Sequence, residues 1–293
     1  MKKYDTFIIG HITVDEVCEP DGTRYGFYGG ATFFSAYAAV AAGARTGILT
    51  KMAPEQKMLM DVVTVPNEDI FFIPCAENTS MTNQYLSADR ERRRLIVQSV
   101  ADPFRITDVP DVESEIFHLA GLINGDFEPG MIEALSKRGK VAVDMQGYLR
   151  CLNRETMEMY FEDYAAKKDI LPYIHFLKTD AAEAEILTGT ADRAEAAKMM
   201  YDWGAKEIII THNTEVLVYD GKEIYTCPIK SRNLSGRTGR GDTTFAAYMT
   251  ERLHADIPTA LRFATAMVSY KMETPGPFKK RRSDVEEYIK LFY

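Results

Sequence analysis

The chain has 293 residues, of which 46% are hydrophobic and 27% are charged, and it carries a formal net charge of -8 at pH 7. This length and composition are typical of one large globular domain, with or without a small appendage, and they exclude a fibrous repeat or a disordered chain. The negative charge argues against nonspecific nucleic-acid binding, which depends on basic residues that face phosphates.

The chain shows no pattern of a membrane segment. No apolar run approaches the roughly 18 residues needed to cross a bilayer, and the first residues lead into a short strand instead of a signal-peptide core. We therefore predict a cytoplasmic protein without membrane contacts. The cysteines at positions 18, 75, 151 and 227 lie far apart, which predicts reduced thiols instead of a metal knuckle or a redox pair.

Short apolar runs alternate with helical patterns along most of the chain. The first run, Tyr4 to Ile9, predicts a buried strand, and it is followed by a small-residue helix from Ala31 to Ala42. Further strands are predicted at residues 46–51, 116–120, 140–144, 174–178 and 207–211, and further helices at residues 131–137, 191–203, 243–253, 258–272 and 283–293. This alternation predicts an α/β fold with a mostly parallel sheet and helices on both faces.

Two segments interrupt the alternation and have strand-like patterns of their own. In the second of them, two strands flank a polar turn that contains Asp89 and Arg90. We predict that these segments form a small β lid over the carboxyl ends of the parallel strands, where ligands bind in such sheets. The predicted division is a core of residues 1–10, 29–81 and 101–293 and a lid of residues 11–28 and 82–100. Exposed strand edges make this lid a candidate surface for a homodimer.

A glycine-rich loop before the predicted helix 243–253 has the clearest chemistry. Gly239 and Gly241 let the backbone turn its amides inward, and the start of the helix favours an anion such as phosphate. The chain contains neither of the fingerprints GxxxxGK[ST] and GxGxxG. A carboxylate beside a bound phosphoryl group can take the proton of an acceptor hydroxyl, so Asp242 is the catalytic candidate. Taken alone, the loop is also compatible with a simple helix N-cap.

Residues 238–247 resemble the DxTGAGDxFxxA signature of the ribokinase-like, or PfkB, carbohydrate kinases. The resemblance extends over essentially the whole chain, since Gly29-Gly30 is similar to the family's N-terminal glycine motif and Asp15 matches the aspartate that holds substrate hydroxyls. It implies a ribokinase-like three-layer α/β/α sandwich. It also implies ATP- and Mg²⁺-dependent phosphorylation of a small sugar or polyol, with a monovalent cation as a further candidate cofactor.

Two further segments resemble functional parts of this family. Residues 178–189 are similar to its NxxE segment, in which Glu183 takes the place of the glutamate that organises Mg²⁺ through water. The segment from Asp144 to Arg150 is similar to one in the inositol-kinase branch, which implies substrate contacts for Gln146 and Arg150. An alternative is that Arg150 pairs with Asp144 and holds the loop.

Several positions depart from the family pattern. Phe34 lies where many sugar kinases carry a substrate-binding asparagine, so furanose recognition in the ribokinase manner is not implied, and its ring can either pack in the core or stack on a base. Asp180 replaces a commoner asparagine near the expected metal. Arg240 replaces the usual alanine, and we expect its side chain to point outward to solvent or to a carboxylate, with a contact to the transferred phosphoryl group as the alternative.

The expected nucleotide loop also differs from the family pattern. Asp180, Thr211, Asn213 and Thr238 are the residues that the resemblance places at the nucleotide. However, Asn213 and Val216 replace the two glycines of a TxGxxG stretch, and valine does not tolerate left-handed backbone. This difference implies that the chain binds ATP in another way than its family does, or that it uses another phosphoryl donor.

Three functions remain open at this point. The favoured one is a kinase for a sugar or an inositol-like polyol, in which Asp242 is the base and Gly239, Arg240 and Gly241 form the anion site. The first alternative is a nucleoside kinase of the same fold. The second is a noncatalytic sugar- or nucleotide-binding protein with a degenerate nucleotide loop.

Overall fold

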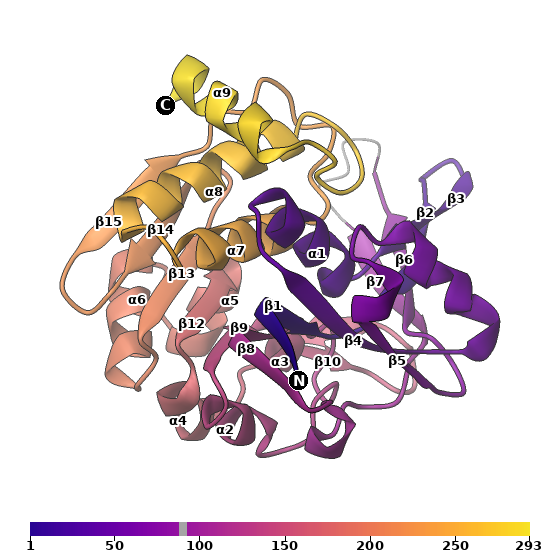
Figure 1. Cartoon of the computed structure of the whole chain (residues 1–293). Coiled ribbons are helices and arrows are strands. Elements are labelled where there is room, and N and C mark those ends of the chain that lie inside the picture. Colours follow the sequence, from indigo (N-terminus) through magenta and orange to yellow (C-terminus); the bar gives the residue numbers. More distant parts are fainter. Residues whose placement is uncertain (88–92) are drawn as a thin grey trace.

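A nine-stranded sheet forms the middle layer of the computed structural model, which describes residues 1–87 and 93–293 (Figure 1). In spatial order its strands are β15 (Ile224–Pro228), β14 (Glu215–Tyr219), β13 (Glu207–Thr211), β12 (Phe176–Asp180), β9 (Lys140–Asp144), β8 (Val112–Leu119), β1 (Lys2–Ile9), β4 (Thr46–Met52) and β5 (Ile70–Pro74). Neighbouring strands from β13 to β5 pair in parallel, whereas β14 and β15 are antiparallel. The predicted mostly parallel sheet is therefore confirmed.

Helices cover both faces of this sheet (Figure 1). One face carries α1 (Ala31–Ala41), α7 (Arg240–Glu251), α8 (Ile257–Lys271) and α9 (Arg282–Phe292), and the other carries α2 (Met131–Ser136), α4 (Lys167–Ile170), α5 (Ala181–Thr188) and α6 (Arg193–Asp202). Strand β13 contributes to both cores, because Ile208 and Ile210 point to one face and Ile209 to the other. The predicted three layers are confirmed, with helix ends within a few residues of those expected.

A second sheet lies beside the sandwich (Figure 1). Its order is β3 (Arg24–Gly29), β2 (Thr13–Cys18), β6 (Ser80–Tyr85) and β7 (Arg93–Ser99). The predicted strands outside the main sheet are thus present. β2 pairs with β3 and β6 pairs with β7 in antiparallel fashion, and the parallel pairing of β2 with β6 joins these two hairpins. The expected polar turn with Asp89 and Arg90 lies outside the described residues. The division into core and lid, and a homodimer through this sheet, stay predictions.

Shorter elements complete the fold. They are α3 (Gln146–Leu149), the hairpin of β10 (Arg150–Leu152) and β11 (Met159–Phe161), and 3₁₀ turns at Pro54–Val62, Asn67–Asp69, Ile106–Asp108 and Leu171–Tyr173. The four cysteines are free thiols, three of them buried. Within the described part of the chain, no helix combines the length and the apolar character that a membrane span requires.

Candidate functional site

A cavity of about 610 Å³ lies where the second sheet faces the carboxyl ends of the parallel strands. Most of the predicted site residues line it, namely Asp15, Gly30, Phe34, Gln146, Arg150, Asp180, Thr211, Thr238, Gly239, Arg240, Gly241 and Asp242. Gly29, Glu183 and Asn213 are not part of this lining, although each contacts a residue that is. The structure therefore brings together residues from distant parts of the chain, while their individual roles stay predictions.

The glycine-rich loop enters α7 through left-handed backbone. Gly239 has φ 76° and precedes the helix, and the amide of Thr243 is the one that donates back to the Gly239 carbonyl, at 3.0 Å. The amides of Gly241 and Asp242 therefore belong to the open first turn, where a helix favours an anion. The Asp242 carboxyl group is half-buried at this position. Burial raises its pKa, and the charges of Lys178 and Arg150 oppose that shift.

The Phe34 ring packs against Gly239 of this loop. A Cβ at Gly239 would overlap the Phe34 ring, and that ring is only 3% exposed. The close approach explains why position 239 has no side chain. It also favours the packing role for Phe34 over stacking on a base.

A buried lysine lies beneath the loop, and sequence analysis assigned it no role. The Lys178 ammonium group is 2.9 Å from Asp144 Oδ2 and 3.6 Å from Glu183 Oε2, and all three side chains are at most 4% exposed. A Cβ at Gly241 would lie 3.1 Å from this nitrogen. Burial disfavours the ammonium charge, but the two carboxylates outweigh it and raise the pKa of Lys178. Lys178 is thus an ion-pair partner of Asp144, and the suggested pairing of Arg150 with the same carboxylate stays a prediction.

Asp180 and Glu183 form a capping box at the start of α5. The Glu183 amide donates to Asp180 Oδ1 at 2.8 Å, and the Asp180 amide donates to Glu183 Oε2 at 2.7 Å. Burial raises the pKa of Glu183 to about 7, with the charge of Lys178 opposing the shift. Among the described residues, no group of three metal-ligating side chains converges. The predicted role of Glu183 at Mg²⁺, through water, stays a prediction.

Asp15 is held in place at the other end of the cavity. The Thr13 hydroxyl donates to its Oδ2 at 2.7 Å, and the Met81 amide donates to its Oδ1 at 3.0 Å. Burial raises the pKa of Asp15 to about 6, against the effect of these two hydrogen bonds. A Cβ at Gly29 would lie 2.6 Å from Asp15 Oδ2. Gly29 therefore makes room for the carboxylate.

Gln146 and Arg150 lie across the cavity from the lid strands. The Gln146 side-chain nitrogen is 3.4 Å from the Gly121 carbonyl, and the Arg150 guanidinium lies 5.7 Å from the centre of the Phe161 ring. Arg150 also lowers the pKa of Asp242, so the two charges act on each other. Both residues line the cavity, and their predicted contact with an acceptor stays a prediction.

The turn between β13 and β14 forms without glycines. Val216 is a buried strand residue that pairs with Thr211, and among the described non-glycine residues only Met157 has positive φ. The Arg240 guanidinium donates to the side-chain oxygen of Asn213 in this turn. We had expected Arg240 to point to solvent or to a carboxylate, and this expectation did not include the side-chain amide of Asn213. The family pattern has a glycine at position 213, which offers no such partner.

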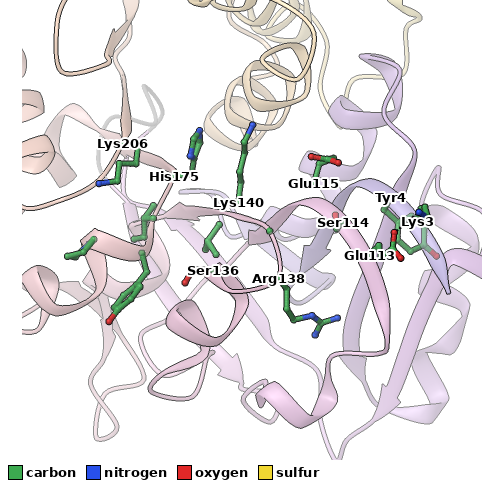
Figure 2. Close-up of a pocket in the computed structure, with 15 residues that line it drawn as sticks. Lys3, Tyr4, Glu113, Ser114, Glu115, Ser136, Arg138, Lys140, His175 and Lys206 are labelled. Carbon is green, nitrogen blue, oxygen red and sulfur yellow. Dashed lines mark ion pairs between the residues drawn. The ribbon is translucent and has the colours of Figure 1, made fainter.

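A larger cavity, of about 800 Å³, lies at the opposite edge of the main sheet (Figure 2). Its lining includes Lys3 and Glu113, which are exposed and form an ion pair at 2.7 Å. Figure 2 shows that Lys140 and His175 extend away from Arg138, so the polar groups do not converge on one point. This cavity does not contain the glycine-rich turn and the Asp242 carboxyl group that line the smaller one.

The chain is similar to known kinases. A family model described as pfkB family carbohydrate kinase matches residues 76–279. A cytidine kinase from Thermococcus kodakarensis is 27% identical over 259 residues, which cover 84% of this chain and 87% of that protein.

Two solved structures are more similar. A sulfate complex of a pyrophosphate-dependent kinase in the ribokinase family is 34% identical with a TM-score of 0.86. Such a kinase complexed with a pyrophosphate analog and myo-inositol is 33% identical with a TM-score of 0.85. Each alignment covers 96% of this chain and 99% of the other. The predicted ribokinase-like fold is thereby confirmed.

Proposed function

Because the chain belongs to the pfkB family of carbohydrate kinases, we propose that it phosphorylates a hydroxyl of a cyclic polyol such as myo-inositol, with pyrophosphate as the donor. The observation that carries this proposal is the position of Asp242, which opens α7 beside the anion-binding turn and lines the same cavity as Asp15. A donor phosphate at the turn and a polyol at Asp15 would place an acceptor hydroxyl between them.

The chemistry follows from the surroundings of Asp242. Its carboxylate accepts the proton of the attacking hydroxyl as the new P–O bond forms. The bridging P–O bond of pyrophosphate breaks and orthophosphate leaves, while the amides of Gly241 and Asp242 stabilise charge on the transferred phosphoryl group. Lys178 adds a fixed positive charge beneath the turn. Mg²⁺, when bound to the donor, neutralises phosphate charge, and Asp180 and Glu183 are the carboxylates placed to hold its waters.

The proposed donor rests on the charges around the loop. Lys178, Arg237 and Arg240 all line the cavity, which suits a compact donor whose charge is concentrated in two phosphates. The hydrogen bond between Arg240 and Asn213 crosses from α7 to the turn that was expected to approach a nucleotide. Two structural relatives are described as pyrophosphate-dependent kinases. ATP remains the rival donor.

A nucleoside is the rival acceptor, favoured by the cytidine kinase among the relatives. Against it, the Phe34 ring is only 3% exposed and packs against Gly239, which leaves little of its face for stacking on a base. The polar groups of Asp15, Gln146 and Arg150 in the cavity wall suit a molecule with many hydroxyls. We therefore place the polyol first.

The test measures phosphorylated product by mass spectrometry for myo-inositol, hexoses and cytidine, each with Mg²⁺ and either pyrophosphate or ATP. We expect product from myo-inositol and pyrophosphate, and a loss of about 10²–10⁴ in kcat for Asp242→Asn, the usual contribution of a general base. The matched control is Asp202→Asn, an exposed aspartate on α6.

Each other result corrects a defined part of the proposal. Product with ATP alone overturns the donor, and product from cytidine alone overturns the acceptor. Ligand binding without turnover for any pair would support the noncatalytic binding protein.

A further inference from the structure

Lys271, the last residue of α8, directs its ammonium group into the backbone just before the anion-binding turn. Its Nζ donates to the Gly236 carbonyl at 2.6 Å and also to the Thr238 carbonyl. The residue is 2% exposed. A buried lysine is usually paired with a carboxylate, whereas this one is hydrogen-bonded by two main-chain oxygens of the loop.

The loop is fixed to the end of α8 at several further points. The Gly236 amide donates to the Met272 carbonyl at 2.7 Å, and the Ser235 hydroxyl donates to the Glu273 carbonyl at 2.9 Å. A Cβ at Gly236 would overlap the Thr274 carbonyl. Lys271 is therefore positioned by its helix, and the loop is pressed against that helix.

The charge of Lys271 faces the site. Its Nζ lies 5.3 Å from the centre of the Phe34 ring, on which the turn at Gly239 also rests. Asp242 is the charged group that acts on it, and Lys271 in turn lowers the pKa of Asp242. Backbone carbonyl oxygens that converge on one point are also ligands for K⁺, so the Lys271 ammonium group occupies a position that suits a free monovalent cation.

We infer that Lys271 is a built-in cation, which holds the Gly236–Thr238 backbone in the shape that binds the donor and makes a free monovalent cation unnecessary. It is a positioning residue, because it touches the loop and not the reacting atoms. The effect on turnover rests on the proposed function. The effect on the loop does not, because both hydrogen bonds join residues of the chain itself.

Hydrogen exchange of the peptide covering residues 233–243 tests the loop without any activity. Lys271→Met removes the charge at nearly constant length, and we expect faster exchange there by about tenfold or more, as for the loss of charge-assisted hydrogen bonds. Added KCl or NH₄Cl should restore slow exchange in this variant, and choline chloride should not. The matched control, Lys279→Met, replaces an exposed lysine and should match the natural chain.

Turnover gives the second readout. We expect the natural chain to be indifferent to K⁺, and Lys271→Met to lose about tenfold or more in kcat/KM for the donor and to regain it with K⁺ or NH₄⁺. If Lys271→Met does not fold, Lys271→Gln keeps a donor without the charge and is measured in the same salts.

Two results would overturn the inference: a requirement of the natural chain for K⁺, or exchange in the Lys271 variants that no salt restores. If no variant or natural chain turns over any substrate, the proposed function fails, while the exchange data still decide the role of Lys271.

Discussion

The Arg240 guanidinium donates a hydrogen bond to the side-chain oxygen of Asn213, which ties the first turn of α7 to the turn between β13 and β14. We predict that Arg240→Ala raises KM for pyrophosphate by about 10–100-fold, the range for losing one charged contact. KM for the polyol should change little, because that ligand lies at the Asp15 end. Initial rates at varied donor and fixed polyol concentration measure both constants.

Arg193 provides the control for this experiment. It pairs with Glu215 at 2.7 Å and holds the same turn outside the cavity. Arg193→Ala should leave the KM for pyrophosphate close to that of the natural chain. An equal rise in both variants would mean that Arg240 only braces the turn.

The Asp15 carboxyl group should impose an acid limit on acceptor use. Burial raises its pKa from 3.8 to about 6, so it accepts hydrogen bonds from hydroxyls above pH 6 and is protonated below it. We expect kcat/KM for the polyol to fall as the pH decreases through about 6, and to lose this limb in Asp15→Asn. If kcat/KM of the Asp15→Asn variant still falls through the same pH range, another group, such as Asp242, is responsible for the pH dependence.

The Lys271 ammonium group should impose an alkaline limit on donor use. Burial lowers its pKa from 10.5 to about 8, and the nearby Asp242 carboxylate opposes part of that shift. Since the cation is present below this pKa and lost above it, kcat/KM for the donor should fall as the pH rises through about 8. In Lys271→Met with saturating K⁺ this limb should be absent, because K⁺ does not titrate.

Replacing Lys178 should destabilise the fold. Lys178→Met leaves Asp144 and Glu183 as buried carboxylates without their cation, and we expect a loss of about 3–5 kcal/mol in the free energy of unfolding. Urea denaturation measures it. The double variant Lys178→Met, Asp144→Asn should recover part of the loss, and a double variant no more stable than the single one would contradict the ion-pair account.

Gly239 should tolerate no side chain. Gly239→Ala adds a Cβ at φ 76° against the Phe34 ring, whereas Gly276→Ala adds one at φ 87° with no atom within 4 Å. The control variant should lose about 1–2 kcal/mol from left-handed strain alone. We expect a larger loss and a lower kcat for Gly239→Ala, measured by urea denaturation and initial rates. Equal losses would show that the Phe34 ring gives way freely.

The sequence predicted those parts of the site that depend on contiguous residues. The turn at Gly239 and the position of Asp242 at the start of α7 follow from local backbone. The capping box of Asp180 and Glu183 is equally local, but these residues were predicted only as candidates for the nucleotide and the metal. The layered fold was equally predictable, because the alternation of strand and helix patterns determines it.

The residues that sequence analysis missed act through tertiary contacts. Lys178 stands at the end of an apolar run, where a lysine signals a buried pair, yet its partner Asp144 comes from another strand. Lys271 ends a helix, and its two carbonyl partners lie more than thirty positions away in the chain. No spacing rule predicts such contacts.

The contact between Phe34 and Gly239 also has a consequence for biosynthesis. α1, most of whose residues are buried in the fold, emerges from the ribosome long before α7, the helix against which it packs. Until then the nascent chain presents an uncovered apolar helix. The site is therefore completed only after α7 has been made, and a ribosome-associated chaperone that shields α1 until then would raise the yield of active enzyme.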